Sequence, residues 1–89
     1  MEGYIGEIRE FSGNFAPRYW ASCDGQVLDI KTYTPLFAII GTMYGGDGVH
    51  NFQLPDLRPT DDAGVKRHGW EIGKPSKIIC IEGIFPDRP

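Results

Sequence analysis

The side chains best suited to catalysis or metal binding in this chain are two cysteines, two histidines and scattered aspartates. Cys23 and Cys80 lie too far apart for the CxxC spacing of zinc and redox sites. His50 and His68 form neither an HExxH nor an HxH pattern. We therefore expect two buried free thiols, histidines at the surface or in turns, and no bound metal or cofactor.

Two further arrangements have some of the residues of a reactive or ligand site. A nucleophilic triad of Cys23, His68 and Asp56 can be assembled on paper, but Cys23 precedes a turn rather than a helix N-terminus that would lower its pKa. Asp47 in the loop 44–48 (YGGDG) is a conceivable calcium ligand, but the DxDxDG series and both phosphate-loop patterns are missing. The sequence predicts a structural turn at this loop and a protein that is not an enzyme.

The polar stretch 60–76 is the part of the chain most suited to ligand contact, because loops of this length usually carry function or are mobile. Trp70 lies among charged neighbours there, which suits an interface anchor, and the alternative is that it caps the core or fills a subunit interface. Basic side chains nearby would donate to a polar or anionic ligand. The residues expected at such a site are Lys66, Arg67, His68, Trp70 and Lys74.

Length and composition indicate one domain over residues 1–89. A chain of 89 residues forms only a small core, so we expect oligomerisation to stabilise it. The net charge is -3, with three basic against six acidic residues before Asp56, which excludes the basic face that nucleic-acid binding needs. No apolar stretch approaches the roughly 20 residues of a membrane span, and the N-terminus lacks a signal-peptide pattern, so we expect cytoplasmic synthesis without membrane insertion.

The elements that must position these residues are short strands and one helix, which makes the predicted fold class α+β with a small mixed β-sheet. Four consecutive apolar residues, 78–81, favour a central strand covered on both faces near the C-terminus, which must reach back to the first strands and bring the termini together. Trp20 is expected in the core. We predict a strand over 4–11, a hairpin over 19–30 that turns at Asp24-Gly25, a helix over 34–40 that Thr34 caps and Gly41 ends, a strand over 51–54 and a last strand over 77–85.

Several segments of the chain resemble the phage tail collar domain, which also occurs in bacterial proteins labelled microcystin-dependent. The resemblance covers residues 3–58 and is most specific in WxxCDGQ, YGGDG and FxLPDLR, while 78–86 (IICIEGIFP) resembles the C-terminal end of the microcystin-dependent proteins. It implies a small α+β domain of trimeric fibres, near the tip of a contractile tail's short fibre, where a host receptor is contacted. The matching segments are 6–9, 14–17, 20–26, 36–37, 40–41, 44–48 and 52–58.

The chain departs from the family pattern in two respects. Met1 lies almost directly before the first expected strand, where fibres carry a long shaft, so we expect no attachment segment. After Pro59, a polar stretch of 17 residues stands where longer relatives have a larger receptor-binding region, so we expect a weaker receptor-binding capacity.

The sequence therefore predicts a non-enzymatic module of a phage tail or tail-like fibre that self-associates, with tail or fibre proteins and a cell-surface glycan as expected partners. The alternative is a free cytosolic oligomer that binds or sequesters a small polar or anionic ligand. The expected location is the virion or a tail-like particle once assembled. Apolar residues that a small fold leaves exposed are expected at the subunit interface, namely Phe11, Phe15, Tyr44 and Phe85.

Overall fold

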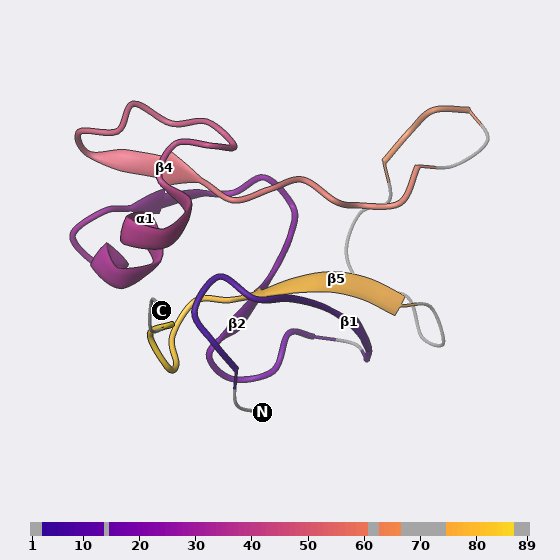
Figure 1. Ribbon diagram of the computed structural model, residues 1–89. Coiled ribbons are helices and arrows are strands. Elements are labelled where there is room, and N and C mark those ends of the chain that lie inside the picture. Colours follow the sequence, from indigo (N-terminus) through magenta and orange to yellow (C-terminus); the bar gives the residue numbers. More distant parts are fainter. Residues whose placement is uncertain (1–2, 14, 61–62, 67–74, 87–89) are drawn as a thin grey trace.

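The fold consists of two small sheets and one helix, in a computed structural model that describes residues 3–13, 15–60, 63–66 and 75–86. One sheet has the strand order β1-β5-β2, the other pairs β3 with β4, and all strand pairs are antiparallel. This confirms the α+β class, with two antiparallel sheets in place of one mixed sheet (Figure 1). The elements are β1 (Ile8–Ser12), β2 (Trp20–Ser22), β3 (Val27–Asp29), α1 (Thr34–Ile40), β4 (Asn51–Gln53) and β5 (Pro75–Cys80).

Strand β5 is the central strand of the larger sheet, as the sequence predicts. Ile79 faces the main hydrophobic cluster, whereas Ile78 and Cys80 face a second cluster that contains Trp20. All three β5 side chains are fully buried, because side chains alternate between the faces of a strand and both faces are covered here.

The bounds of β5 differ from the predicted 77–85. The strand begins at Pro75, where the missing N–H of a proline is tolerated at a first strand position. It ends at Cys80 because the N–H groups of Ile81 and Glu82 both donate to the carbonyl of Tyr19, at 2.9 and 3.2 Å, and the chain then bends. The prediction placed Pro75 in the polar loop 60–76 and was wrong at both ends.

The predicted hairpin over 19–30 is also wrong, because β2 pairs with β5 and β3 pairs with β4. Gly25 does adopt the positive φ (76°) expected of this turn. Its N–H donates to the Pro55 carbonyl at 3.2 Å, and the side-chain amide of Gln26 donates to the Ser22 carbonyl at 2.8 Å. The turn is thereby opened into a corner that leads from one sheet to the other.

The N-terminal segment is shorter as a strand than the predicted 4–11. Gly6 has a φ of 88°, and the N–H of Glu7 donates back to the Tyr4 carbonyl at 2.9 Å, so the chain turns before β1 begins at Ile8. Tyr4 forms a parallel bridge with Ile84, and the Ile5 N–H donates to the Ile84 carbonyl at 2.9 Å. The first and last described segments therefore lie together, as expected from a returning C-terminal segment.

Helix α1 has the predicted span. It starts with a proline in its first turn, and the N–H of Gly41 donates to the Phe37 carbonyl at 2.8 Å where the helix ends. Thr34 is not the N-cap: that position is Tyr33, and the Thr34 hydroxyl donates to the Ile30 carbonyl at 2.9 Å. Leu36 and Ile40, four positions apart, face the main cluster.

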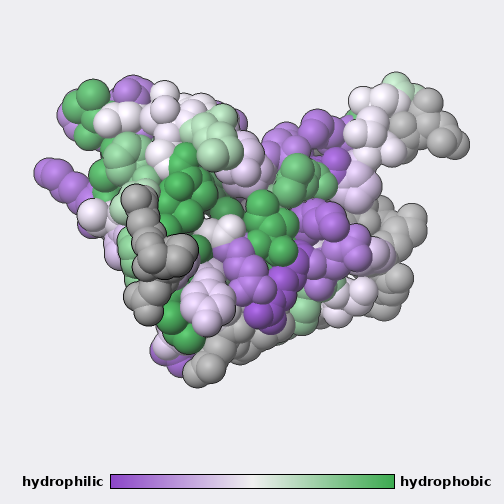
Figure 2. Space-filling model, viewed as in Figure 1, coloured by the Kyte–Doolittle hydropathy of each residue, from purple (hydrophilic) through white to green (hydrophobic). Residues whose placement is uncertain are grey.

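The main hydrophobic cluster lies where α1 meets both sheets. Phe52 of β4 is fully buried in it, and its ring centroid is 5.4 Å from that of Phe37. Figure 2 shows hydrophobic side chains over the middle and the helix side of one face, with hydrophilic ones over the β1 and β5 end. The buried members of the cluster are Ile5, Cys23, Leu36, Ile40, Phe52, Leu54 and Ile79.

Because β5 belongs to both clusters, we predict that the chain unfolds as one domain. Ile78→Val and Ile79→Val, on opposite faces of β5, should each lower the free energy of unfolding by about 0.5–1.5 kcal/mol. Urea titrations followed by tryptophan fluorescence and by far-UV circular dichroism should give coincident transitions for both variants. Val49→Ala, at a side chain 73% exposed, is the control and should change stability by less than about 0.5 kcal/mol. Separate transitions from the two probes would contradict the single domain.

Candidate functional site

Two of the most distinctive sequence motifs are hydrogen-bonded to each other through their backbones. The N–H of Leu57 donates to the Cys23 carbonyl at 2.8 Å, and the N–H of Leu54 donates to the Gln26 carbonyl at 2.9 Å. Between these bonds, Asp24 and Asp56 form an antiparallel bridge. The segments 23–26 (CDGQ) and 54–57 (LPDL) thus satisfy one another's backbone groups, which buried chain requires. Their residues hold the corner between the two sheets.

The third motif, 44–48 (YGGDG), packs on strand β4. The N–H of Gln53 donates to the Gly45 carbonyl at 3.1 Å. Gly46 has a φ of 99°, and a Cβ there would lie 2.5 Å from the Cα of Phe52. Only glycine fits so close to another backbone in this conformation. The structural turn predicted for this loop is confirmed.

Asp47 holds the same loop closed. Its Oδ1 accepts the backbone N–H groups of Val49, His50 and Asn51 at 2.8, 2.8 and 3.0 Å. These bonds to the ionised carboxylate lower its pKa from the ordinary value, with a smaller contribution from the nearby imidazole of His50. The observed geometry gives Asp47 a turn-forming role in place of a calcium ligand's role.

Asp56 ties the LPDL segment to the chain that follows it. Its two carboxylate oxygens accept from the Arg58 guanidinium at 3.0 and 2.9 Å, and the Lys66 ammonium lies 3.3 Å from Oδ1. The hydrogen bonds from Arg58 are the main cause of the lowered pKa of Asp56. Thr60 and Lys66 are bridged as well, so residues 63–66 return toward Asp56.

The cysteines are free and buried, as expected from their spacing. Burial raises the pKa of the Cys23 thiol to about 12, so it stays protonated at neutral pH and is a poor nucleophile. Burial also raises the pKa of Cys80. His50 is exposed, with Nδ1 3.6 Å from Asp47. Within the described ranges, His, Cys, Asp and Glu side chains form no group of three or more suited to a metal ion.

The residues predicted for ligand contact fall mostly in a part of the chain that is not described. Arg67, His68, Trp70 and Lys74 lie outside the described residues, and His68 is also the histidine of the triad assembled on paper from Cys23, His68 and Asp56. Lys66 is described and its ammonium is paired with Asp56. The Lys66 ammonium therefore stabilises the fold through Asp56 and is less available to a ligand.

Three of the four residues predicted for a subunit interface are exposed aromatic side chains. Phe15, Tyr44 and Phe85 are 68%, 38% and 49% exposed. Phe11 is partly buried and packs against the cluster that holds Trp20, so it is less available to a partner. Trp20 itself is buried, which confirms its assignment to the core.

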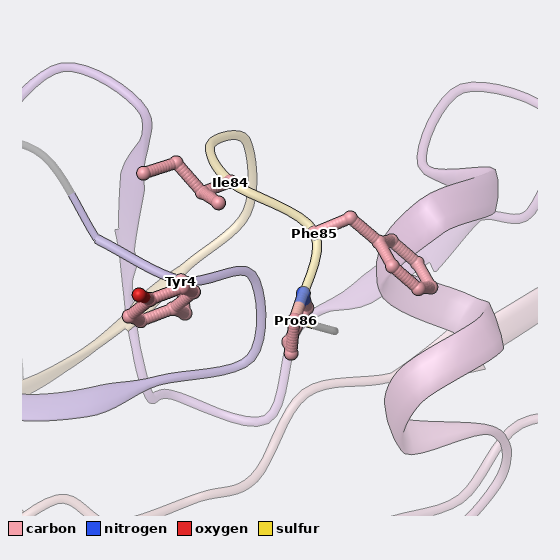
Figure 3. A pocket seen from close by; sticks show the side chains of 4 residues that line it. All are labelled: Tyr4, Ile84, Phe85 and Pro86. Atoms are coloured by element: carbon pink, nitrogen blue, oxygen red, sulfur yellow. The ribbon is translucent and has the colours of Figure 1, made fainter. Parts of the chain in front are cut away.

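Sequence reasoning missed a hollow where the first and last described segments meet. The hollow has a volume of about 360 Å³ and is lined by Tyr4, Ile84, Phe85 and Pro86. Figure 3 shows Tyr4 coming from the N-terminal segment and the other three from the C-terminal one, with the Phe85 ring on the side of α1. No local pattern could have identified this surface, because it exists only when residues about 80 positions apart are joined.

A second hollow, of about 300 Å³, is lined by Ile5, by residues at the start of α1 and by residues 81–83. It mixes apolar side chains with the hydroxyl-bearing Thr32 and Tyr33 and with Glu82. Across the described residues, no helix is long and apolar enough to cross a bilayer.

The lowered pKa values of Asp47 and Asp56 predict acid sensitivity. A carboxylate with a depressed folded-state pKa stabilises the fold above its unfolded pKa of about 3.9, and this stabilisation is lost as the pH falls further. The melting temperature should therefore decrease as the pH is lowered from 5 to 3. The melting temperature of Asp47→Asn should be lower than that of the wild type at pH 7 and should change less with pH, because the titrating group is gone.

Salt distinguishes the two carboxylates. The decrease in melting temperature caused by Asp56→Asn should become smaller in high salt, because the cations that bind Asp56 are partly exposed. The decrease caused by Asp47→Asn should persist in high salt, because backbone N–H groups bind Asp47. A pH profile of Asp47→Asn parallel to that of the wild type would contradict the role assigned to Asp47.

The hydrogen-bonded motif segments coincide with a known sequence family. The family described as the phage tail collar domain matches residues 6–60, which contain the corner 23–26, the loop 44–48 and the segment 54–57. No curated protein and no solved structure is significantly similar to the chain. Since the match spans more than half of the 89 residues, the chain belongs to the phage tail collar domain family, whose domains are structural parts of phage tails and associate with tail or fibre proteins.

Proposed function

We propose that this chain is a self-associating, non-enzymatic structural module of a phage tail or tail-like fibre. The observation that carries the proposal is that polar side chains of the family motifs bind groups of their own chain. Their polar groups are engaged inside the chain: Asp47 binds three backbone N–H groups, Asp56 binds Arg58 and Lys66, and Gln26 binds Ser22. Residues paired in this way stabilise the fold, and contacts with other molecules are left to the outer surface.

The exposed surface supports contact with other protein chains. Phe15, Tyr44 and Phe85 are large aromatic side chains in water, a class that is enriched in the buried centres of interfaces. The small core leaves this apolar surface uncovered in a single chain. We propose that neighbouring subunits or tail proteins cover it in the assembled particle, with a trimer as the arrangement implied by the family.

Receptor contact is the finer part of the proposal. Lys66 is held near the LPDL segment by its ion pair with Asp56, so the stretch that follows it starts from a fixed point at the edge of the domain. Arg67, His68, Trp70 and Lys74 belong to that stretch. We propose them as the contacts to a host-surface glycan, because aromatic and basic side chains supply the apolar face and the donors that a sugar needs.

The structural role is tested by location. An epitope-tagged chain expressed in a host that produces tails or tail-like particles should sediment with the particles in a density gradient and remain with them after a salt wash. Gly46→Val, which places a side chain against the Phe52 backbone, should abolish this incorporation because the collar motif cannot form. Tagged wild-type chain found entirely in the free fraction would contradict the proposal.

The free ligand-binding alternative is tested by thermal shift. Bound ligand raises the melting temperature by mass action. Because Lys66 is already paired, we predict that inorganic phosphate raises the melting temperature no more than chloride at equal ionic strength. A specific, saturable increase with phosphate that is lost in Lys74→Ala would instead favour a protein that sequesters an anion.

A further inference from the structure

We propose that the second hollow is a binding site for a primary ammonium group at the end of a short aliphatic chain. This adds a ligand site to the proposed structural module and uses none of the residues proposed for receptor contact. The volume of about 300 Å³ lies at the lower end of the range of about 300–1000 Å³ found for small-molecule sites. Below it is called the Glu82 hollow, and its lining is Ile5, Thr32, Tyr33, Pro35, Ile81, Glu82 and Gly83.

The charge of the hollow favours a cation. Among the described residues that line it, Glu82 alone has a charged side chain, a carboxylate. Elsewhere in the fold Glu7, Glu10 and Asp56 are each paired with a cationic side chain. Within the described ranges, the Glu82 carboxylate has no such partner. A ligand that supplies the missing positive charge is therefore favoured, and an anion is disfavoured.

The hydroxyl groups of the hollow also suit a hydrogen-bond donor. The Thr32 hydroxyl donates its proton to Oδ2 of Asp29 at 3.1 Å, so toward a ligand it can only accept. The Tyr33 hydroxyl can accept as well, and a carboxylate such as Glu82 accepts only. An ammonium group has three donors and no acceptor, which is the complement of this set.

The rest of the lining requires an apolar stem on the ligand. Ile5 is buried in the main hydrophobic cluster, and Tyr33 and Ile81 pack against that cluster. Pro35 adds another apolar ring. Methylene groups gain from covering such surfaces, as the stem of a lysine side chain does. A bare metal ion gains nothing from them and would need more oxygen ligands than one carboxylate and two hydroxyls supply.

The start of helix α1 does not reverse this preference, although a helix N-terminus favours anions. Pro35 has no N–H, and the Tyr33 N–H donates to the Asp29 carbonyl at 3.1 Å. The Asp29 carboxylate, hydrogen-bonded to Thr32, adds negative charge at the same end of the helix. Both features reduce the positive potential that an ammonium group would meet.

The backbone fixes the polar groups before a ligand arrives. The Glu82 N–H donates to the Tyr19 carbonyl at 3.2 Å, and the Cys80 thiol donates to the Glu82 carbonyl at 3.1 Å. On the helix side, the Tyr33 carbonyl accepts the N–H of Phe37 at 3.0 Å. Segments held in this way lose little conformational entropy on binding.

The experiment uses n-butylammonium chloride as the probe and follows the backbone amide signals of the full chain by NMR. The signals of Ile5, Thr32 and residues 81–83 should shift saturably, with a dissociation constant on the order of millimolar because few atoms are buried. n-Butanol keeps the aliphatic chain without the charge, and ammonium chloride keeps the charge without the chain. Each should bind about tenfold more weakly or less.

Glu82→Gln keeps the size of the side chain and removes its charge, so it should weaken n-butylammonium binding about tenfold. Glu10→Gln removes the same charge from a side chain outside the hollow and should keep the wild-type affinity. Thr32→Val, which removes an acceptor, is the second variant if Glu82→Gln does not fold, and it should also weaken binding. Unchanged affinity in Glu82→Gln, or an equal loss in Glu10→Gln, would overturn the inference.

Two further probes separate the sources of the ammonium group from a different ligand class. A lysine blocked at both ends that binds as tightly as n-butylammonium would assign the site to a lysine side chain of a partner protein, and weaker binding would assign it to a free amine. Methyl glucoside offers hydroxyl donors without a charge. Tighter binding of the glucoside than of n-butylammonium would contradict an ammonium site and indicate a sugar site.

Discussion

Both hydrophobic clusters of this protein depend on one strand. Ile79 of β5 packs with the helix and the β3–β4 side, while Ile78 and Cys80 pack with Trp20 on the opposite face. A six-residue strand supplies so much of the interior because a small domain has few side chains to bury. β1 and β2 lie on either side of β5, so the positions of the first two strands are fixed only when the end of the chain arrives.

The family motifs join two sheets that are each too small to be stable alone. The corner 23–26 and the segment 54–57 bond to each other, and the loop 44–48 packs its glycines against β4. An isolated two-stranded sheet such as β3–β4 is marginal in water. Its attachment to the larger sheet through this corner, and its burial of Phe52 against Phe37, make it part of a common core.

Among the described residues, this fold leaves few polar groups of the motifs available for binding a ligand or for catalysis. The motif carboxylates of Asp47 and Asp56 bind groups of their own chain, and the Cys23 thiol is buried with a raised pKa. What remains is an outer surface on which aromatic and aliphatic side chains are incompletely covered. This balance is consistent with a module whose work is contact.

The sequence by itself determined most features that depend on local geometry: the helix over 34–40, the turn at 44–48, the strand predicted over 51–54 and found at 51–53, the buried run predicted over 78–81 and found at 78–80, and the family. Each follows from residues within one segment, such as Pro35 and Gly41 at the ends of the helix. Only the tertiary structure decided strand pairing. Asp24-Gly25 has the composition of a hairpin turn, but its neighbours bond to residues 53–56 and 77–80, because competition between distant backbone partners is invisible in a local pattern. The hollow lined by Tyr4, Ile84, Phe85 and Pro86 was hidden for the same reason: Phe85 could be named as exposed, but Tyr4 and Ile84 are brought together only by backbone bonds between two distant segments.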